Sequence, residues 1–275
     1  MEPKRQVTIA IVQMNCSLRD KDANIQKVER FLTRLQDVQM ICLPELFTTG
    51  YNLDELAGDL YALGEPIPGP TTERMRELAR KHNVAILGNI VEGGGTTDEA
   101  LYDTTFMISA AGRMIGKYRK THLHPTERRL FRPGHKLPVF EWAGLKMATA
   151  TCYDLAFPEL FRTLALKGAE IVLLPSATPR GYEYLLDVRT RARAQDNQIF
   201  VAVANHVGHE GQVGYCGLSL IANPRGTVVA QAPAYDEEIQ TARLDLDLMA
   251  QERTQEQIFE HLRPELYTSA AFSGR

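Results

Sequence analysis

The hydrophobic and polar residues of this chain follow two different spacings. Short runs of apolar and β-branched residues are typical of strands, whereas apolar residues that recur every three or four positions are typical of helices. This pattern predicts strands at residues 7–13, 40–45, 84–91, 101–109, 116–123, 139–142, 146–152, 169–175, 200–205, 217–222, 227–232 and 239–246. It predicts helices at residues 22–35, 71–81, 158–166 and 184–198.

Polar and glycine-rich segments separate these elements. Residues 47–70 are rich in Gly, Pro, Asp and Thr, and we predict a long loop of the kind that often carries function. Turns are predicted at the glycine triplet 93–95 and at residues 143–144. Thr71 is the expected N-cap of the helix that follows the loop, because a threonine hydroxyl can accept a hydrogen bond from a free N–H group there.

The order of the elements predicts the fold class. Strands alternate with helices early in the chain, whereas hairpin-linked strands occupy the middle and late parts. This mixture favours an α/β fold with a mixed sheet, or with two packed sheets and helices outside, over a purely doubly wound nucleotide fold. No linker, low-complexity block or internal repeat interrupts the 275 residues. We therefore expect one domain over residues 1–275, with a tail from residue 249 that starts as a helix and becomes irregular.

Composition and charge narrow the class of protein. The formal net charge of −3 gives no electrostatic reason to expect nucleic acid or an anionic membrane as a partner. No apolar run approaches the roughly 20 residues that span a bilayer, and the N-terminus lacks the apolar core of a signal peptide. The cysteines lie far apart at positions 16, 42, 152 and 216, which argues against a disulfide framework or a zinc knuckle. The expectation is a cytoplasmic protein with free thiols.

Cys152 lies where a predicted strand gives way to a predicted helix. The N-terminal end of a helix favours a thiolate over a thiol and can also stabilise an oxyanion, so the cysteine is a candidate nucleophile. The alternative is a buried cysteine that serves only as a small hydrophobic residue. His122 and His124 would share a face of an extended segment and could contribute to a metal site, but no clustered ligand motif accompanies them.

Two further strand ends carry ionisable residues, Glu45 and Lys120. Because the ends of neighbouring strands can meet at one edge of a sheet, these residues can come together with Cys152. The glutamate could take the thiol proton, the lysine could hold the charge of a tetrahedral intermediate, and the sulfur could form a thioester. Taken singly, Glu45 could be a capping or surface carboxylate, and Lys120 could belong to a solvated basic face.

Three motifs in this order resemble the signature of the nitrilase superfamily of carbon–nitrogen hydrolases: Leu-Pro-Glu at 43–45, Tyr-Arg-Lys-Thr-His-Leu at 118–123, and Cys-Tyr-Asp…Phe-Pro-Glu at 152–159. The resemblance extends over nearly the whole chain. It implies a four-layer α-β-β-α sandwich of two mixed β-sheets, and pairing of protomers into an eight-layered α-β-β-α-α-β-β-α dimer. It also implies that the protein needs no metal and no organic cofactor.

The resemblance also assigns roles to residues. Cys152 would be the nucleophile, Glu45 the general base, Lys120 the oxyanion stabiliser, and Glu127 a second carboxylate that orients substrate and supports the lysine. The backbone N–H of Tyr153 would be a second oxyanion donor. The implied reaction is attack on an amide carbonyl, loss of ammonia or an amine, and hydrolysis of the thioester.

The residues after the nucleophile suggest a branch of the family. Cys152-Tyr153-Asp154 is similar to the pattern of amidases and carbamoyl-amide hydrolases, whereas true nitrilases usually have Cys-Trp-Glu. Ala156 stands where many related patterns have an arginine that could pair with a substrate carboxylate. We therefore hypothesise a pocket for a neutral, small or moderately apolar amide. Its expected lining is Tyr51, Tyr153, Ala156, Ala177 and Thr178.

Several alternatives stay open at this point. Arg180 could restore carboxylate binding from another direction. The enzyme could be a nitrilase proper or an N-carbamoyl amide hydrolase, or the chain could be a scaffold that keeps the fold without catalysis. A homodimer or an assembly of dimers is expected, with helix 158–166, the basic run 189–193 and the tail 249–275 as candidate contacts between protomers.

Overall fold

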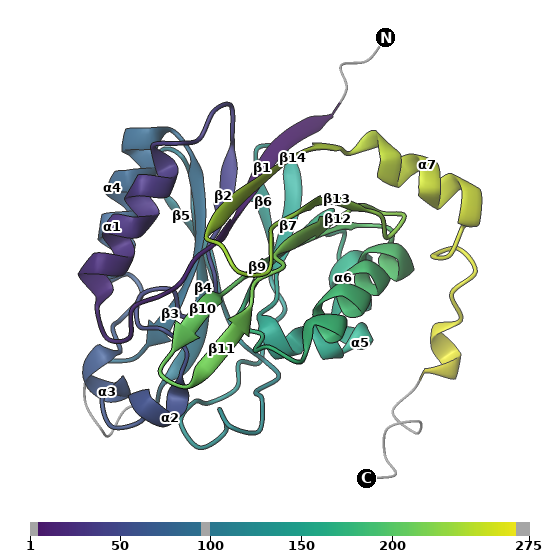
Figure 1. Ribbon diagram of the computed structural model, residues 1–275. Coiled ribbons are helices and arrows are strands. Elements are labelled where there is room, and N and C mark those ends of the chain that lie inside the picture. The colour runs from purple at the N-terminus through teal and green to yellow at the C-terminus, as the bar shows by residue number, and fades with distance from the viewer. Residues whose placement is uncertain (1–4, 95–99, 268–275) are drawn as a thin grey trace.

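The computed structural model describes residues 5–94 and 100–267, and most of the strands in these ranges form two six-stranded sheets that face each other (Figure 1). The first sheet has the strand order β14-β1-β2-β3-β4-β5. Its strands are β1 (Gln6–Gln13), β2 (Met40–Cys42), β3 (Ala85–Glu92), β4 (Tyr102–Ile108), β5 (Met114–Arg119) and β14 (Glu238–Asp245). Strands β1, β2 and β3 run parallel to one another and the remaining neighbours are antiparallel, so this sheet is mixed.

The second sheet has the order β13-β12-β9-β8-β7-β6. Its strands are β6 (Val139–Trp142), β7 (Leu145–Thr149), β8 (Ile171–Ser176), β9 (Phe200–Asn205), β12 (Leu220–Ala222) and β13 (Val228–Gln231). Strands β7, β8 and β9 are parallel, and the outer pairs are antiparallel. The second sheet therefore repeats the mixed arrangement of the first.

Helices cover the outer faces of the sandwich. Helices α1 (Lys21–Leu32) and α4 (Pro70–His82) lie side by side over the first sheet, and α5 (Pro158–Leu166) and α6 (Glu183–Asn197) lie over the second (Figure 1). Helix α7 (Asp247–Glu256) and the turn Pro264–Leu266 extend beyond this body. No helix within the described ranges is long and apolar enough to cross a membrane. The predicted α-β-β-α sandwich of two mixed sheets is confirmed, while its pairing into eight layers stays a prediction.

Strand β1 is covered on both of its faces. Ile9 and Ile11 point into the core between the sheets, whereas Ala10 and Val12 pack against the helices over the first sheet. A strand that is covered on both faces reads as a continuous apolar run, because successive side chains point in opposite directions. The two sheets thus share one inner core and each has an outer core beneath its helices.

The structure differs from the predicted elements in three places. The predicted loop 47–70 contains two short helices, α2 (Leu53–Leu56) and α3 (Leu60–Leu63). Thr71 is not the N-cap of α4: that position is Gly69, whose N–H donates to the Thr72 hydroxyl, while the Thr71 hydroxyl donates to Glu65.

The third difference is a hairpin, β10 (Val207–Glu210) and β11 (Val213–Cys216), that the sequence pattern did not predict. Its residues include Gly208, Gly211 and Gly214, which weaken the alternation that identifies a strand. Part of the predicted turn 93–95, the glycine at position 95, lies outside the described residues.

Candidate active site

Glu45, Lys120 and Cys152 lie just beyond the ends of β2, β5 and β7. Lys120 Nζ lies 2.7 Å from Glu45 Oε1, although the two residues are 75 positions apart in the chain. The thiol of Cys152 is near enough to raise the pKa of the Glu45 carboxyl electrostatically. The structure therefore brings together the three residues that the sequence motifs singled out.

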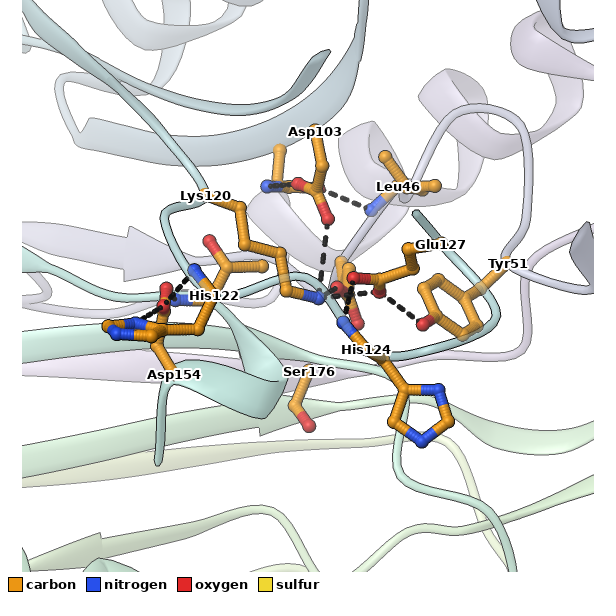
Figure 2. Close-up of polar contacts among 12 residues, drawn as sticks. Leu46, Tyr51, Asp103, Lys120, His122, His124, Glu127, Asp154 and Ser176 are labelled. Atoms are coloured by element: carbon orange, nitrogen blue, oxygen red, sulfur yellow. Dashed lines mark hydrogen bonds and ion pairs between the residues drawn. The ribbon is translucent and has the colours of Figure 1, made fainter. Parts of the chain in front are cut away.

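The ammonium group of Lys120 is fully buried and faces three carboxylates (Figure 2). Besides Glu45, its Nζ lies 2.6 Å from Glu127 Oε1 and 3.6 Å from Asp103 Oδ2. The acid side chains are themselves buried. One positive charge cannot balance three negative ones, so a dry site of this kind favours retention of a proton on one carboxyl.

Burial and neighbouring charges shift the pKa values of these groups. Burial opposes the charge of Lys120, but Glu127 and Glu45 outweigh burial and raise the pKa of the lysine well above its usual value. Burial also raises the pKa of Glu45 well above its usual value, and the Lys120 ammonium only partly offsets this. The lysine is therefore a permanent cation, while the glutamate has the proton affinity that a general base needs.

Glu127 is held by hydrogen bonds to both of its carboxylate oxygens. The hydroxyl of Tyr51 and the ammonium of Lys120 both donate to Oε1, and the backbone N–H of His124 donates to Oε2 at 2.7 Å. With donors on both oxygens, this carboxylate is held in one orientation. Tyr51 and Glu127 thus connect the loop 47–70 to the lysine (Figure 2).

The hairpin β10–β11 supports the same region from the other side. Glu210 accepts hydrogen bonds from the backbone N–H groups of Tyr51 and Asn52, at 2.8 and 2.7 Å. His206, just before β10, hydrogen-bonds through Nε2 to the backbone oxygen of Glu45, and its Nδ1 lies 3.2 Å from Glu210 Oε1. Glu45 and Tyr51 are therefore positioned by one buried polar network.

Cys152 opens a turn of 3₁₀-helix, Cys152–Ala156, and has φ of +42°. A non-glycine residue rarely adopts this left-handed conformation, and such backbone strain is concentrated at functional sites. The α-helix predicted at 158–166 follows this turn with the predicted bounds. The half-buried cysteine side chain lines a cavity.

The carboxylate of Asp154, which is fully buried, joins the nucleophile turn to the lysine segment. Its Oδ2 accepts from the backbone N–H of Thr151 at 2.9 Å and from the hydroxyl of Tyr118 at 2.6 Å. Its Oδ1 accepts from the backbone N–H of His122 at 3.0 Å and lies 2.8 Å from His122 Nδ1 (Figure 2). One carboxylate therefore sets the position of the residues beside Cys152 and beside Lys120.

A cavity of about 370 Å³ opens at Cys152. Most of its lining side chains are apolar or aromatic, which suits a small organic ligand rather than a polymer. The residues that line it are Tyr51, Asn52, Leu53, Asp54, His124, Thr126, Cys152, Tyr153, Leu155, Ala177, Thr178, Pro179, Tyr182, Leu185, Leu186, Arg189, Val213 and Tyr215.

Of the five residues expected to line the pocket, Tyr51, Tyr153, Ala177 and Thr178 do so. Ala156 is not among the lining residues. It ends the 3₁₀ turn on the side of α6, and its carbonyl oxygen accepts a hydrogen bond from Arg193 at 3.4 Å.

The basic residues near the cavity also differ from the hypothesis. Arg180 does not line it: its guanidinium lies over the ring of Tyr235, 5.2 Å from the centroid. Arg189, on α6, does line it and has no ion-pair partner among the described residues. The run 189–193 was expected to form a solvated or interface face, but Arg189 lies on the face of α6 that carries Leu185 and Leu186 into the cavity.

Two groups of acids, histidines or cysteines are clustered among the described residues. The carboxylates around Lys120 do not form a metal site, because the ammonium group occupies the position between them. The other group consists of Cys16, His206 and Glu210. Burial opposes the charge of His206, but Cys16 and Glu210 outweigh burial and raise the pKa of His206 well above its usual value. His122 and His124 do not come together in either group.

Sequence reasoning missed Asp103 and its neighbour Asn89. Both lie on strands whose alternation points them toward the second sheet, at positions where a sandwich core is usually apolar. Asn89 Nδ2 donates to Asp103 Oδ1 at 2.6 Å, and Asn89 Oδ1 accepts from the backbone N–H of Leu46 at 2.7 Å. A carboxylate on the same strand face as Met107, which packs in the inner core, is the signal that could have identified this residue.

The family model of carbon–nitrogen hydrolases matches residues 8–254. The chain belongs to the carbon–nitrogen hydrolase family. This assignment agrees with the resemblance to the nitrilase superfamily and with the order of the residues at the site.

Relatives within the carbon–nitrogen hydrolase family are similar along almost their whole length. A protein of Pyrococcus abyssi named nitrilase is 35% identical, with 95% of this chain and 99% of that protein aligned. The 2-oxoglutaramate amidase of Bacillus subtilis is 32% identical, with 94% and 99% aligned. A solved structure of a glutamate-to-glutamine mutant of the amidase from Nesterenkonia sp. AN1 has a TM-score of 0.82 and 26% identity over 95% of this chain and 98% of that one. That structure holds an acrylamide adduct on its active-site cysteine.

Proposed function

We propose that this protein is an amidase, which hydrolyses a small-molecule amide to a carboxylic acid and ammonia through a thioester on Cys152. The observation that carries the proposal is the buried ammonium of Lys120 between the carboxylates of Glu45 and Glu127, beside a cavity that the cysteine lines. The acrylamide adduct on the active-site cysteine of the Nesterenkonia amidase supports the same role for Cys152.

The first half of the reaction forms the thioester. Glu45 takes the thiol proton of Cys152, and the sulfur attacks the amide carbonyl carbon. The charge that develops on the carbonyl oxygen is stabilised by Lys120 Nζ and by the backbone N–H of Tyr153. The protonated Glu45 then gives its proton to the departing nitrogen, so that ammonia leaves as a neutral molecule.

The second half hydrolyses the thioester. Glu45, again ionised, takes a proton from a water molecule that attacks the thioester carbonyl. The same two donors stabilise the second tetrahedral intermediate. When this intermediate collapses, the Cys152 sulfur leaves and recovers the proton that Glu45 holds. The raised proton affinity of Glu45 suits both directions of transfer, because a catalytic acid and base works best with a pKa near the working pH.

The apolar lining of the cavity supports a neutral, small or moderately apolar amide as substrate. Arg189 favours a second candidate, an amide that carries a carboxylate at its far end, because this arginine lines the cavity and has no ion-pair partner among the described residues. Nitrile and N-carbamoyl substrates remain the alternatives within the same site chemistry.

Ammonia release tests the proposal. Wild-type protein is incubated with matched primary amides, nitriles and N-carbamoyl compounds in neutral, amino-bearing and carboxyl-bearing forms, beside Cys152→Ala. Cys216→Ala is the control, since Cys216 is a buried free thiol outside the cavity lining. Amide turnover that is lost in Cys152→Ala and kept in Cys216→Ala is expected. If wild-type protein turns over nothing and its Cys152 does not react with iodoacetamide, the scaffold alternative replaces the amidase.

We further propose that the protein is a cytoplasmic homodimer that pairs through α5 and α6. The tail 249–275, of which residues 268–275 lie outside the described residues, is the further predicted contact. Exposed apolar side chains on these helices support the pairing, Leu166 on α5 and Tyr184 and Val188 on α6. The four free thiols suit a reducing compartment. Light scattering of wild-type protein and of Val188→Glu measures the assembly, and an unchanged mass in the variant argues against this contact.

A further inference from the structure

The hydrogen-bond donors around Glu45, Asp103 and Glu127 indicate where the extra proton of the active centre lies. Both oxygens of Glu127 have donors, as described above. By contrast, Glu45 Oε2 and Asp103 Oδ2 are buried oxygens for which no donor lies within hydrogen-bond distance among the described residues. An ionised carboxylate without a donor is costly in a dry site. The proton that the excess of negative charge requires therefore belongs with Glu45 and Asp103, whose free oxygens it can satisfy.

The two carboxyl groups are close enough to share that proton. Carboxylate oxygens of Glu45, Asp103 and Glu127 lie within 4.8 Å of one another, and a protonated Glu45 is in position to donate to Asp103. If both carboxylates are ionised, neither can donate a hydrogen bond to the other, so their free oxygens have no donor. One proton between them gives a hydrogen bond that satisfies both oxygens.

Each of the two acids also has one fixed donor. Asp103 Oδ1 already accepts from Asn89 at 2.6 Å, and that donor cannot rotate away because the amide oxygen of Asn89 is held by the Leu46 N–H. The backbone oxygen of Asp103 also accepts from the N–H of Lys120 at 2.9 Å, which places the acid beside the lysine. Glu45 Oε1 likewise has a fixed donor, the ammonium of Lys120 at 2.7 Å, so each acid keeps one free oxygen and the proton lies between those two oxygens.

We propose that Asp103 is a positioning residue of this centre, whose carboxylate accepts the proton of Glu45 in a shared hydrogen bond and thereby sets the pH above which Glu45 can act as a base. This inference rests on the proposed role of Glu45 in the amidase. The charged and titratable groups around the pair are Lys120, Glu127, Tyr51, Cys152, Tyr215 and His206, whose Nε2 hydrogen-bonds to the backbone oxygen of Glu45. Of the two acids that lie near Glu45, only Asp103 has a carboxylate oxygen without a hydrogen-bond donor.

Asp103→Asn tests the proposal, because asparagine keeps the shape and the hydrogen bond with Asn89 but removes the charge. Without the neighbouring charge Glu45 loses its proton more easily, so the acid limb of kcat/KM should move to lower pH by about one unit. Thr105→Val is the matched control, since Thr105 lies on the same strand and also contacts Asn89, at 3.0 Å, but carries no charge. An acid limb that stays in place, or that moves to higher pH, in Asp103→Asn overturns the proposal.

A second readout does not depend on amide turnover. The rate at which iodoacetamide alkylates Cys152 should show the same acid limb, and the limb should shift in Asp103→Asn as it does for kcat/KM. If wild-type protein hydrolyses no amide but its alkylation limb shifts, the proposed function fails and the pairing of Asp103 with Glu45 stands. If amides are hydrolysed and neither limb shifts, the amidase stands and the pairing fails.

Infrared spectroscopy covers the case in which Asp103→Asn does not fold. Wild-type protein at neutral pH should show the carbonyl band of a buried protonated carboxyl group, and this band should be lost in Glu45→Gln. Absence of the band in folded wild-type protein, or its persistence at full strength in Glu45→Gln, overturns the proposal.

Discussion

Asp154 offers a test of how the two halves of the active site are held together. Its carboxylate accepts from five donor groups, two of which are the backbone N–H groups of Thr151 and His122. These two residues flank Cys152 and Lys120 in the chain. Asp154→Asn keeps the volume of the side chain but replaces one accepting oxygen with an NH₂ group. In either orientation of the amide, this NH₂ faces a backbone N–H that then has no acceptor.

The expected cost follows from the lost contacts. A hydrogen bond to a charged group contributes about 1.5–3 kcal/mol, and a buried donor left without a partner costs about 1–3 kcal/mol. We therefore expect Asp154→Asn to lower the free energy of unfolding by about 3 kcal/mol, which corresponds to a fall in Tm of roughly 6–12 °C. A displacement of the nucleophile turn by about 1 Å should also lower kcat on the order of 100-fold.

Urea unfolding and the initial rate of ammonia release measure the two effects. Asp187→Asn is the matched control, because Asp187 is 42% exposed and its ion pair with Arg191 spans 3.6 Å on the surface of α6. Its cost should stay below about 0.5 kcal/mol, with kcat unchanged. A loss in Asp154→Asn no larger than that of Asp187→Asn would refute the claim that this carboxylate holds the site together. Lost stability with unchanged kcat would refute only the catalytic part.

Three further outcomes are expected. Tyr51→Phe removes a hydrogen bond to the Glu127 carboxylate and should lower kcat roughly tenfold, measured by ammonia release; an unchanged kcat would contradict its positioning role. Arg189→Leu should lower kcat/KM roughly tenfold for a carboxylate-bearing amide and leave its neutral analogue unaffected, whereas Arg191→Leu should alter neither; equal effects on both substrates would exclude charge recognition. Burial opposes the charge of Glu92, but hydrogen bonds from basic residues of β5 outweigh it and lower its pKa to about 2. Because the folded-state pKa is depressed, the destabilisation caused by Glu92→Gln should be complete above about pH 4.5 and disappear as the pH falls toward about 2, which urea unfolding across this range measures; a pH-independent difference would show that the charge does not matter.

Much of the fold could be predicted from local patterns. The strands Val139–Trp142 and Phe200–Asn205 and the helix Pro158–Leu166 have the predicted boundaries, because apolar runs end there at turn residues or at a proline that begins a helix. The hairpin β10–β11 could not be predicted in this way. Its order comes from pairing with its own partner strand and from the buried contacts of Glu210.

The sequence by itself determined which chemical groups the protein can use. Glu45 and Cys152 were visible at the ends of apolar runs, whereas Lys120 was visible through the motif at 118–123. Only the tertiary structure determined which side chains adjust proton affinity at the site and which discriminate between substrates. Asp103 acquires a role because β4 lies beside β5, and Arg189 because α6 turns one face toward the cavity. The physical reason is that proton affinity and ligand selectivity depend on burial and on charges distant in the chain, which a local pattern of residues does not record.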